Sequence, residues 1–147
     1  MEKINFDWGL LCNSSVIDKD TNNISLNSVI EEITVKSKKG GAEFPKKGAV
    51  IDFSFEFVCT WSRRKNFNLE ESADARLEIL DPTEKKINTI DYKLRFNPKI
   101  KRIRSRVNFN NLLVTGVGDF TFISSIKEGK SRQFKEVSRL VIPIKIE

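Results

Sequence analysis

The sequence predicts an all-β protein: an antiparallel β-sandwich of about eight strands, immunoglobulin-like or with a similar Greek-key arrangement. Apolar residues occupy every odd position from Ile51 to Trp61, and mostly polar residues fill the even positions, which is typical of a half-buried strand. Similar short segments recur at even spacing, separated by turn residues. The eleven Phe and two Trp residues favour strands, and helix-period segments are scarce.

Short connections join the predicted strands. A turn at residues 20–23 leads from the first strand to its expected hairpin partner, residues 24–35. The polar segment 36–47, which holds two glycines and Pro45, is predicted to be a loop. One apolar face of the first strand is expected to consist of Phe6, Trp8, Leu10, Cys12 and Val16. The strands are predicted at residues 6–16, 24–35, 50–61, 73–79, 87–96, 100–109, 114–126 and 134–146.

The charge of the chain is concentrated in its second half. The 147 residues fit a single domain, residues 1–147, with a formal net charge of +6. Residues 1–73 carry 10 basic and 11 acidic side chains, whereas residues 74–147 carry 16 basic and 9 acidic ones. No acidic residue occurs between Asp91 and Asp119. This asymmetry is compatible with an anionic partner, although many basic proteins bind none.

A row of arginines is the main candidate contact site. Arg102, Arg104 and Arg106 fall on one face of a predicted strand, at intervals of about 6.6–6.8 Å. Such a row could contact successive phosphates or an acidic protein surface. Lys93 and Arg95 would extend it if their strand is the hairpin neighbour.

Two other interpretations of the basic residues stay open. Acids on adjacent strands, such as Glu56 and Glu78, could neutralise the row, or the row could protect an exposed sheet edge from association. No stacking aromatic residue clearly shares the arginine face, which ranks nucleic acid below an anionic protein or ligand. A second, loop-borne candidate beside Trp61 consists of Arg63, Arg64 and Lys65.

The sequence lacks the residues of several catalytic and metal sites. It contains no histidine, which excludes Ser-His-Asp and Cys-His catalysis and His-containing zinc sites. Two cysteines cannot form a four-thiolate zinc site, and no phosphate-binding loop motif occurs. Gly116 and Gly118 are expected to be strand glycines, not a dinucleotide fingerprint. We therefore expect no cofactor, no metal and no enzymatic activity.

Pairs of carboxylates leave one kind of catalysis open. Glycoside hydrolysis needs two carboxylates across a cleft, and the candidate pairs are Glu31/Glu32, Glu70/Glu71 and Asp18/Asp20. Adjacent residues of a strand point to opposite faces, so solvated charges are the favoured interpretation of the first two pairs. The aspartates are expected to form a turn, with calcium binding as the alternative.

The cysteines and the N-terminal residues predict a reducing location. Residues 1–5 lack the apolar run of a signal peptide, and no segment approaches the length of a membrane helix. A cytoplasmic protein with reduced thiols is expected. Cys12 and Cys59 are predicted to be small buried hydrophobic residues, and an inter-sheet disulfide is the alternative.

Several segments resemble those of an uncharacterised bacterial domain family of unknown function. The similar segments are residues 12–18 and 24–33, Phe44-Pro45, residues 77–82, residues 118–122 and residues 141–144. Thr83 and Glu84 stand where the family has Asp-Gly in a turn. The resemblance implies a bacterial or phage-like sandwich module, and it implies no catalytic residues.

These observations favour a non-enzymatic protein-interaction or assembly module, with a protein partner or a second copy as ligand. The alternative is binding of nucleic acid or another polyanion through the basic strand face. A carboxylate-based hydrolase is the second alternative.

Overall fold

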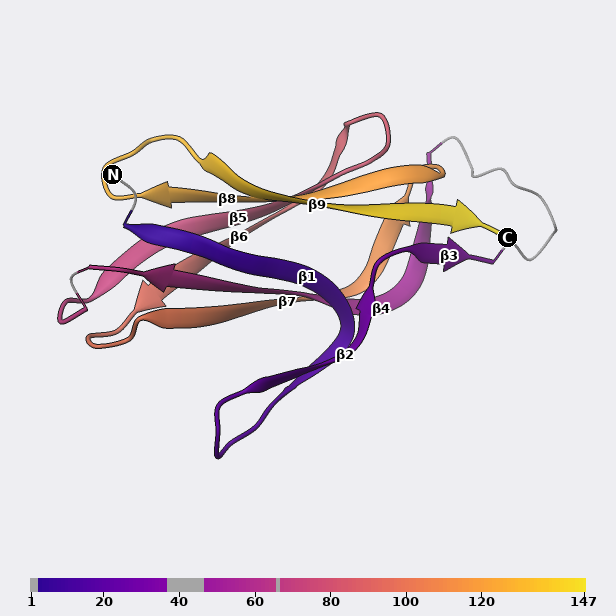
Figure 1. Cartoon of the computed structure of the whole chain (residues 1–147). Coiled ribbons are helices and arrows are strands. Elements are labelled where there is room, and N and C mark those ends of the chain that lie inside the picture. Colours follow the sequence, from indigo (N-terminus) through magenta and orange to yellow (C-terminus); the bar gives the residue numbers. More distant parts are fainter. Residues whose placement is uncertain (1–2, 37–46, 66) are drawn as a thin grey trace.

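A computed structural model describes residues 3–36, 47–65 and 67–147, and it is an all-β sandwich. Sheet A has the strand order β2-β1-β4-β7, and sheet B has the order β3-β9-β8-β5-β6 (Figure 1). The described residues contain no helix, as the fold class predicted from the sequence requires. The strands are β1 (Ile4–Ile17), β2 (Ile24–Ile30), β3 (Ile33–Val35), β4 (Ala49–Arg63), β5 (Glu71–Leu80), β6 (Lys86–Phe96), β7 (Arg102–Val114), β8 (Gly118–Glu128) and β9 (Lys135–Ile146).

The chain crosses repeatedly between the two sheets. β4 and β7 are neighbours in sheet A, although β5 and β6, which separate them in sequence, lie in sheet B. β5 likewise pairs with β8 across the excursion of β7 into sheet A. This is the crossover pattern of a Greek-key sandwich. Neither sheet is built from a contiguous part of the chain.

Aromatic side chains of β4 fill the space between the sheets. Phe55, Phe57 and Trp61 are almost completely buried, which confirms that the odd positions from Ile51 to Trp61 face the core. The ring of Phe55 stacks on Phe109 of β7 with centroids 4.6 Å apart, and it meets Phe122 of β8 edge to face at 6.3 Å. Each such side chain contributes about 1.5–3 kcal/mol to stability through burial alone.

The face predicted for the first strand is partly wrong. The register of β1 against β4 shifts between Phe6 and Trp8, where one extra residue forms a bulge. Beyond the bulge Gly9 and Leu11 face the core, whereas Trp8 is exposed to 37% and Val16 to 59%. A Cβ on Gly9 would lie 2.8 Å from the ring of Phe6, so glycine is required for this packing.

The predicted strand 24–35 is two strands that lie in different sheets. β2 pairs with β1 in sheet A, and β3 pairs in parallel with β9 in sheet B, so sheet B is mixed. The apolar positions change from even (Ile24, Leu26 and Ile30) to odd (Ile33 and Val35) across Glu31 and Glu32, a signal of the break that the prediction of one strand overlooked. The loop predicted at 36–47, with Pro45, and the resemblance at Phe44-Pro45 fall largely or wholly on residues 37–46, outside the described residues.

Both cysteines are buried, unpaired thiols, as predicted. Cys59 faces the core and Cys12 lies on the opposite face of sheet A, beside Glu56. An inter-sheet disulfide is therefore incompatible with this arrangement. Within the described ranges, no helix has the length and apolar character needed to cross a membrane.

Candidate functional site

The arginine row stands on the outer face of sheet A, but each arginine has a partner within the molecule. Arg102 lies 3.3 Å from the carboxylate of Asp7 on β1. The Arg104 guanidinium donates to the carbonyl of Asn22 at 3.1 Å, and that of Arg106 donates to Ser15 Oγ at 3.2 Å. The three side chains share one face, as predicted, and they bind the β1–β2 hairpin and β1 itself.

The β1–β2 hairpin turns back beneath sheet A, as Figure 1 shows. Ser15, which accepts the hydrogen bond from Arg106, itself donates to the carboxylate of Glu56 on β4. Under this cover Val58 and Thr60, on the outer face of β4, are buried. Burial, followed by the nearby charge of Glu56, raises the pKa of Cys12. The outer face of sheet A is therefore partly covered by the chain itself.

Lys93 and Arg95 do not extend the arginine row. β6 lies in sheet B and β7 in sheet A, so the two strands are not hairpin neighbours. The Lys93 ammonium lies 2.7 Å from Asp74, and the Arg95 guanidinium lies 2.8 Å from Glu70.

Arg63, proposed from the sequence as a partner contact, is only 3% exposed. Its guanidinium donates to four main-chain carbonyls from two loops that lie far apart in sequence. The acceptors and distances are Ile100 at 2.8 Å, Leu69 at 2.6 Å, Phe67 at 3.1 Å and Asn97 at 2.9 Å. The guanidinium carbon also lies 5.3 Å from the ring centroid of Phe96. Arg63 thus fixes the β4–β5 and β6–β7 loops to each other, whereas its neighbour Arg64 is exposed.

Main-chain hydrogen bonds hold the same two loops together. The amide of Lys99 donates to the carbonyl of Phe67, and the amide of Arg63 donates to Lys101 at 2.9 Å. Lys99 has φ 69°, a left-handed conformation that costs a non-glycine residue about 1–2 kcal/mol. The surrounding hydrogen bonds maintain it. These hydrogen bonds fix the main chain of both loops, while Leu69 and Ile100 on them are 61% and 43% exposed.

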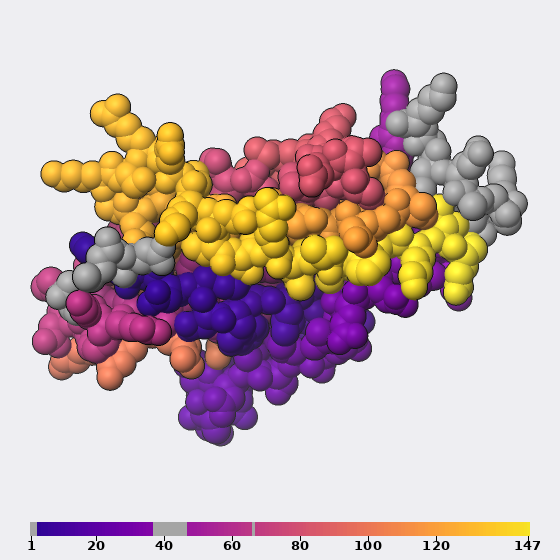
Figure 2. Space-filling model, turned by 45° about the horizontal axis from the view of Figure 1, so that its top comes forward, coloured from indigo at the N-terminus to yellow at the C-terminus, as the bar shows by residue number. Residues whose placement is uncertain are grey.

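The β8–β9 loop lies at the same end of the sandwich (Figure 1). Its residue Phe134 packs under two cations of sheet B: the guanidinium of Arg76 lies 3.9 Å from the ring centroid, and the ammonium of Lys127 lies 4.9 Å away. Gly129 has φ 56° and begins the turn, in which the amide of Ser131 donates to Glu128. Side chains of this loop and of the β4–β5 loop project at this end in Figure 2.

We name this surface the loop end and define it as residues 64–65, 67–70, 97–101 and 129–134. Six basic residues and one acidic residue lie in it, so its formal charge is +5, against +6 for the whole chain. The one acid, Glu70, is paired with Arg95 of β6. The basic residues are Arg64, Lys65, Lys99, Lys101, Lys130 and Arg132.

The sequence indicated part of this surface, through Arg64 and Lys65, but the contributions of the other two loops were not predicted. Each of the three loops carries at least two basic residues, which is a signal that the sequence contains. In a Greek-key sandwich, alternate loops gather at the same end. Applied to the strand order, this rule predicts that the three loops lie at one end of the sandwich.

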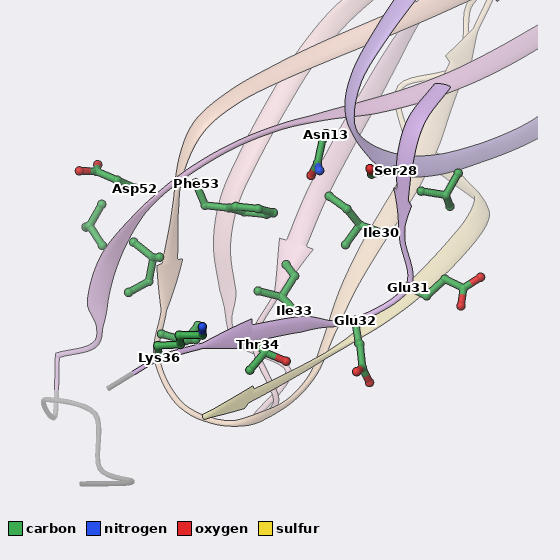
Figure 3. A pocket seen from close by; sticks show the side chains of 14 residues that line it. Asn13, Ser28, Ile30, Glu31, Glu32, Ile33, Thr34, Lys36, Asp52 and Phe53 are labelled. Atoms are coloured by element: carbon green, nitrogen blue, oxygen red, sulfur yellow. The ribbon is translucent and has the colours of Figure 1, made fainter. Parts of the chain in front are cut away.

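A hollow with a volume of about 890 Å³ lies elsewhere, between β2, β3 and β4. In Figure 3 the side chains of Ile30, Ile33 and Phe53 point into it. The carboxylates of Glu32 and Asp52 lie on opposite sides and point away from the hollow. Glu32 is paired with Lys145 at 3.2 Å. This arrangement does not aim two carboxylates at a shared substrate position.

Asp18 and Glu71, two of the other carboxylates considered from the sequence, have structural partners. Asp18 accepts the amides of Asp20 and Thr21 in the turn, which lower its pKa and confirm the turn interpretation. Glu71 lies 3.6 Å from Lys3. Across the described ranges, no group of three Cys, Asp or Glu side chains is arranged to hold a metal ion.

No protein-family model matches the chain, and a search of curated proteins finds none that is significantly similar.

Proposed function

We propose that this chain is a non-enzymatic protein-binding module and that it contacts its partner through the loop end. The observation that carries the proposal is the exposure of Leu69 and Ile100 on loops whose main chain is held by the buried Arg63. A preorganised surface loses little entropy on binding, and exposed apolar side chains contribute affinity when a partner covers them.

The strand order supports this assignment. The core strands β1-β4-β7 and β9-β8-β5-β6 follow an immunoglobulin-like order, and in such domains the loops of one end commonly contact ligands. Two free, buried thiols support a reducing, cytoplasmic location as part of the proposal.

A comparison of matched variants tests the surface. Burying Leu69 and Ile100 in a partner contributes about 3 kcal/mol, which corresponds to about a hundredfold in affinity. We expect L69S/I100S to lose a partner that tagged wild-type protein retains from an extract of its own cells. The control V117S/V141S removes two similarly exposed valines away from the loop end and should retain that partner.

Two outcomes contradict the proposal. Equal retention by L69S/I100S and wild type would place the contact elsewhere. If light scattering shows only monomers and the tagged protein retains no specific partner, the protein-binding function is contradicted. If wild type forms dimers that L69S/I100S does not form, the partner is a second copy of the chain.

Polyanion binding through Arg102, Arg104 and Arg106 is the second candidate, and the charge of the second half of the chain favours it. It requires the row to exchange its contacts with Asp7, Asn22 and Ser15 for phosphates. Replacing the three arginines by Ser should then weaken binding and reduce its salt dependence. A carboxylate-based hydrolase has no comparable support from the described carboxylates.

A further inference from the structure

We propose that the partner of the loop end is an acidic protein segment that carries aliphatic side chains. This inference rests on the proposed function and adds the chemistry of the ligand. Two properties of the loop end carry it: its positive charge, and the aliphatic side chains exposed among those charges.

The loop end has a net positive formal charge, and the basic residues of its β6–β7 and β8–β9 loops are exposed. Glu70, the one acidic residue, is engaged by Arg95 of β6, 2.8 Å away. Lys99 and Lys101 flank Ile100 on the β6–β7 loop, and both are exposed. Lys130 and Arg132 are exposed on the β8–β9 loop at the same end (Figure 1). An acidic segment is complementary to this field, which increases both its rate of association and its specificity.

The aliphatic side chains set a second requirement for the ligand. Leu69 and Ile100 lie on different loops, but Arg63 binds the main-chain carbonyls of both residues, at 2.6 and 2.8 Å. Their backbones are therefore held by one side chain while their side chains remain exposed. A ligand with acidic residues alone would leave this apolar surface in water, whereas aliphatic side chains of a partner would cover it.

The same residues favour a protein over a nucleic acid. Binding of single-stranded nucleic acid relies on aromatic rings that stack on bases. The loop end contains two aromatic residues, Phe67 and Phe134. Both are half-buried, and their rings are occupied: the Lys101 ammonium lies 4.9 Å from the ring centroid of Phe67, and Phe134 packs against Arg76 and Lys127. Leu69 and Ile100 cannot stack on bases.

Fluorescence anisotropy with three labelled probes tests the inference. The probes are a peptide of glutamates with interspersed leucines, an oligoglutamate of equal charge, and single-stranded oligothymidylate. We expect wild type to bind the leucine-containing peptide about tenfold more tightly than oligoglutamate at low salt, because only that peptide covers Leu69 and Ile100. All binding should weaken as salt is added.

Variants separate the two requirements. L69S/I100S should bind both peptides equally, and K99E/K101E should weaken binding of both by about tenfold or more. The control K19E/K47E reverses two exposed lysines outside the loop end and should stay within about twofold of wild type. Circular dichroism and thermal unfolding verify that each variant is folded.

Several results would overturn the inference. Equal wild-type affinity for the two peptides would remove the aliphatic requirement. Tightest binding to oligothymidylate, unchanged in L69S/I100S, would make the ligand a nucleic acid. Absence of peptide binding by folded wild type at low salt would reject the acidic ligand. In that last case, selective loss of a cellular partner by L69S/I100S would still support the proposed function.

Discussion

At the scale of single residues, Arg63 shows how a side chain with the chemistry of a surface contact can become internal. Its position in the sequence, next to Arg64 and Lys65, indicates a basic loop. In the structure its guanidinium instead satisfies four carbonyls from two loops. Those acceptors lie up to 37 positions away in the chain, so only the tertiary arrangement reveals this role. Arg64, one residue later, retains the predicted exposure.

Glu84, in the turn between β5 and β6, provides a prediction at this scale. It has φ 65°, a left-handed conformation that glycine adopts without the steric penalty of a side chain. We expect Glu84→Gly to raise the free energy of unfolding by about 0.5–1 kcal/mol, because relief of the penalty exceeds the added entropy of the unfolded chain. Urea denaturation measures the change.

The variant Glu84→Ala controls for the loss of the carboxylate, whose negative charge attracts the guanidinium of Arg139. Alanine keeps the Cβ and its steric penalty, so this variant should remain close to wild type in stability. Equal stabilisation by Ala and Gly would show that charge, and not backbone conformation, determines stability at this position.

At the scale of elements, alternation in the sequence predicted strands well and their pairing poorly. The odd positions of β4 face the core as expected, and from Phe55 to Trp61 the strand pairs with β7 without a register shift and keeps its period of two. One extra residue after Phe6 reversed the faces of β1, and the sequence marks this place with Asp7 and Gly9, two residues that are uncommon within strands. The crossing from β2 to β3 is marked in the sequence, since the apolar positions change from even to odd across residues 31–32, but this signal was overlooked.

Asp81 joins the turn of the β5–β6 hairpin to the β7–β8 connection, which crosses between the sheets. One carboxylate oxygen accepts the amides of Thr83 and Lys85 and the Thr83 hydroxyl, and the other accepts the hydroxyl of Thr115 at 2.9 Å. Burial alone would raise the pKa of Asp81, but these hydrogen bonds together lower it. The β5–β6 and β7–β8 turns are thus fixed to each other by a carboxylate whose lowered pKa favours its ionised form.

The lowered pKa of Asp81 predicts a pH-dependent contribution to stability. A depressed folded-state pKa stabilises the protein above the unfolded value of about 3.9, and this contribution is lost as pH falls through the folded pKa. We expect Asp81→Asn to lower the free energy of unfolding by about 1–2 kcal/mol at neutral pH, because hydrogen bonds to a charged acceptor are stronger. Urea denaturation from pH 7 to about pH 3 measures both proteins.

The difference between wild type and Asp81→Asn should stay constant down to about pH 4 and narrow below it. If the stability difference between the two proteins stays undiminished below about pH 4, the ionised carboxylate is not the stabilising species. No difference at neutral pH would show that the Asn side chain replaces these hydrogen bonds fully.

At the scale of the whole molecule, composition predicted the fold class, and topology determined the candidate site. The basic residues of the three loops are visible in the sequence. Their collection at one end, with Leu69 and Ile100 among them, depends on which strands are neighbours in space. The arginine row of β7 was predicted on the correct strand face. The sequence did not predict that the β1–β2 hairpin covers this row, because the contacting residues of the hairpin lie 82 and 91 positions away in the chain.

The crossovers between the sheets predict that the described strands unfold together. Sheet A needs β4 and β7, while β5 and β6, which lie between them in sequence, belong to sheet B, so neither sheet can persist when the other is lost.

The two tryptophans report on different parts of the sandwich, because Trp61 lies in the shared core and Trp8 lies on the outer face of sheet A. In Trp8→Phe, fluorescence reports the core, and in Trp61→Phe it reports the outer face. Within each variant we expect fluorescence and far-ultraviolet circular dichroism to give the same urea midpoint. Trp61→Phe should lower the midpoint for both probes, because it leaves space in the core. A Trp8 transition that precedes the loss of circular dichroism would instead show that β1 and its hairpin separate from a sandwich that remains folded.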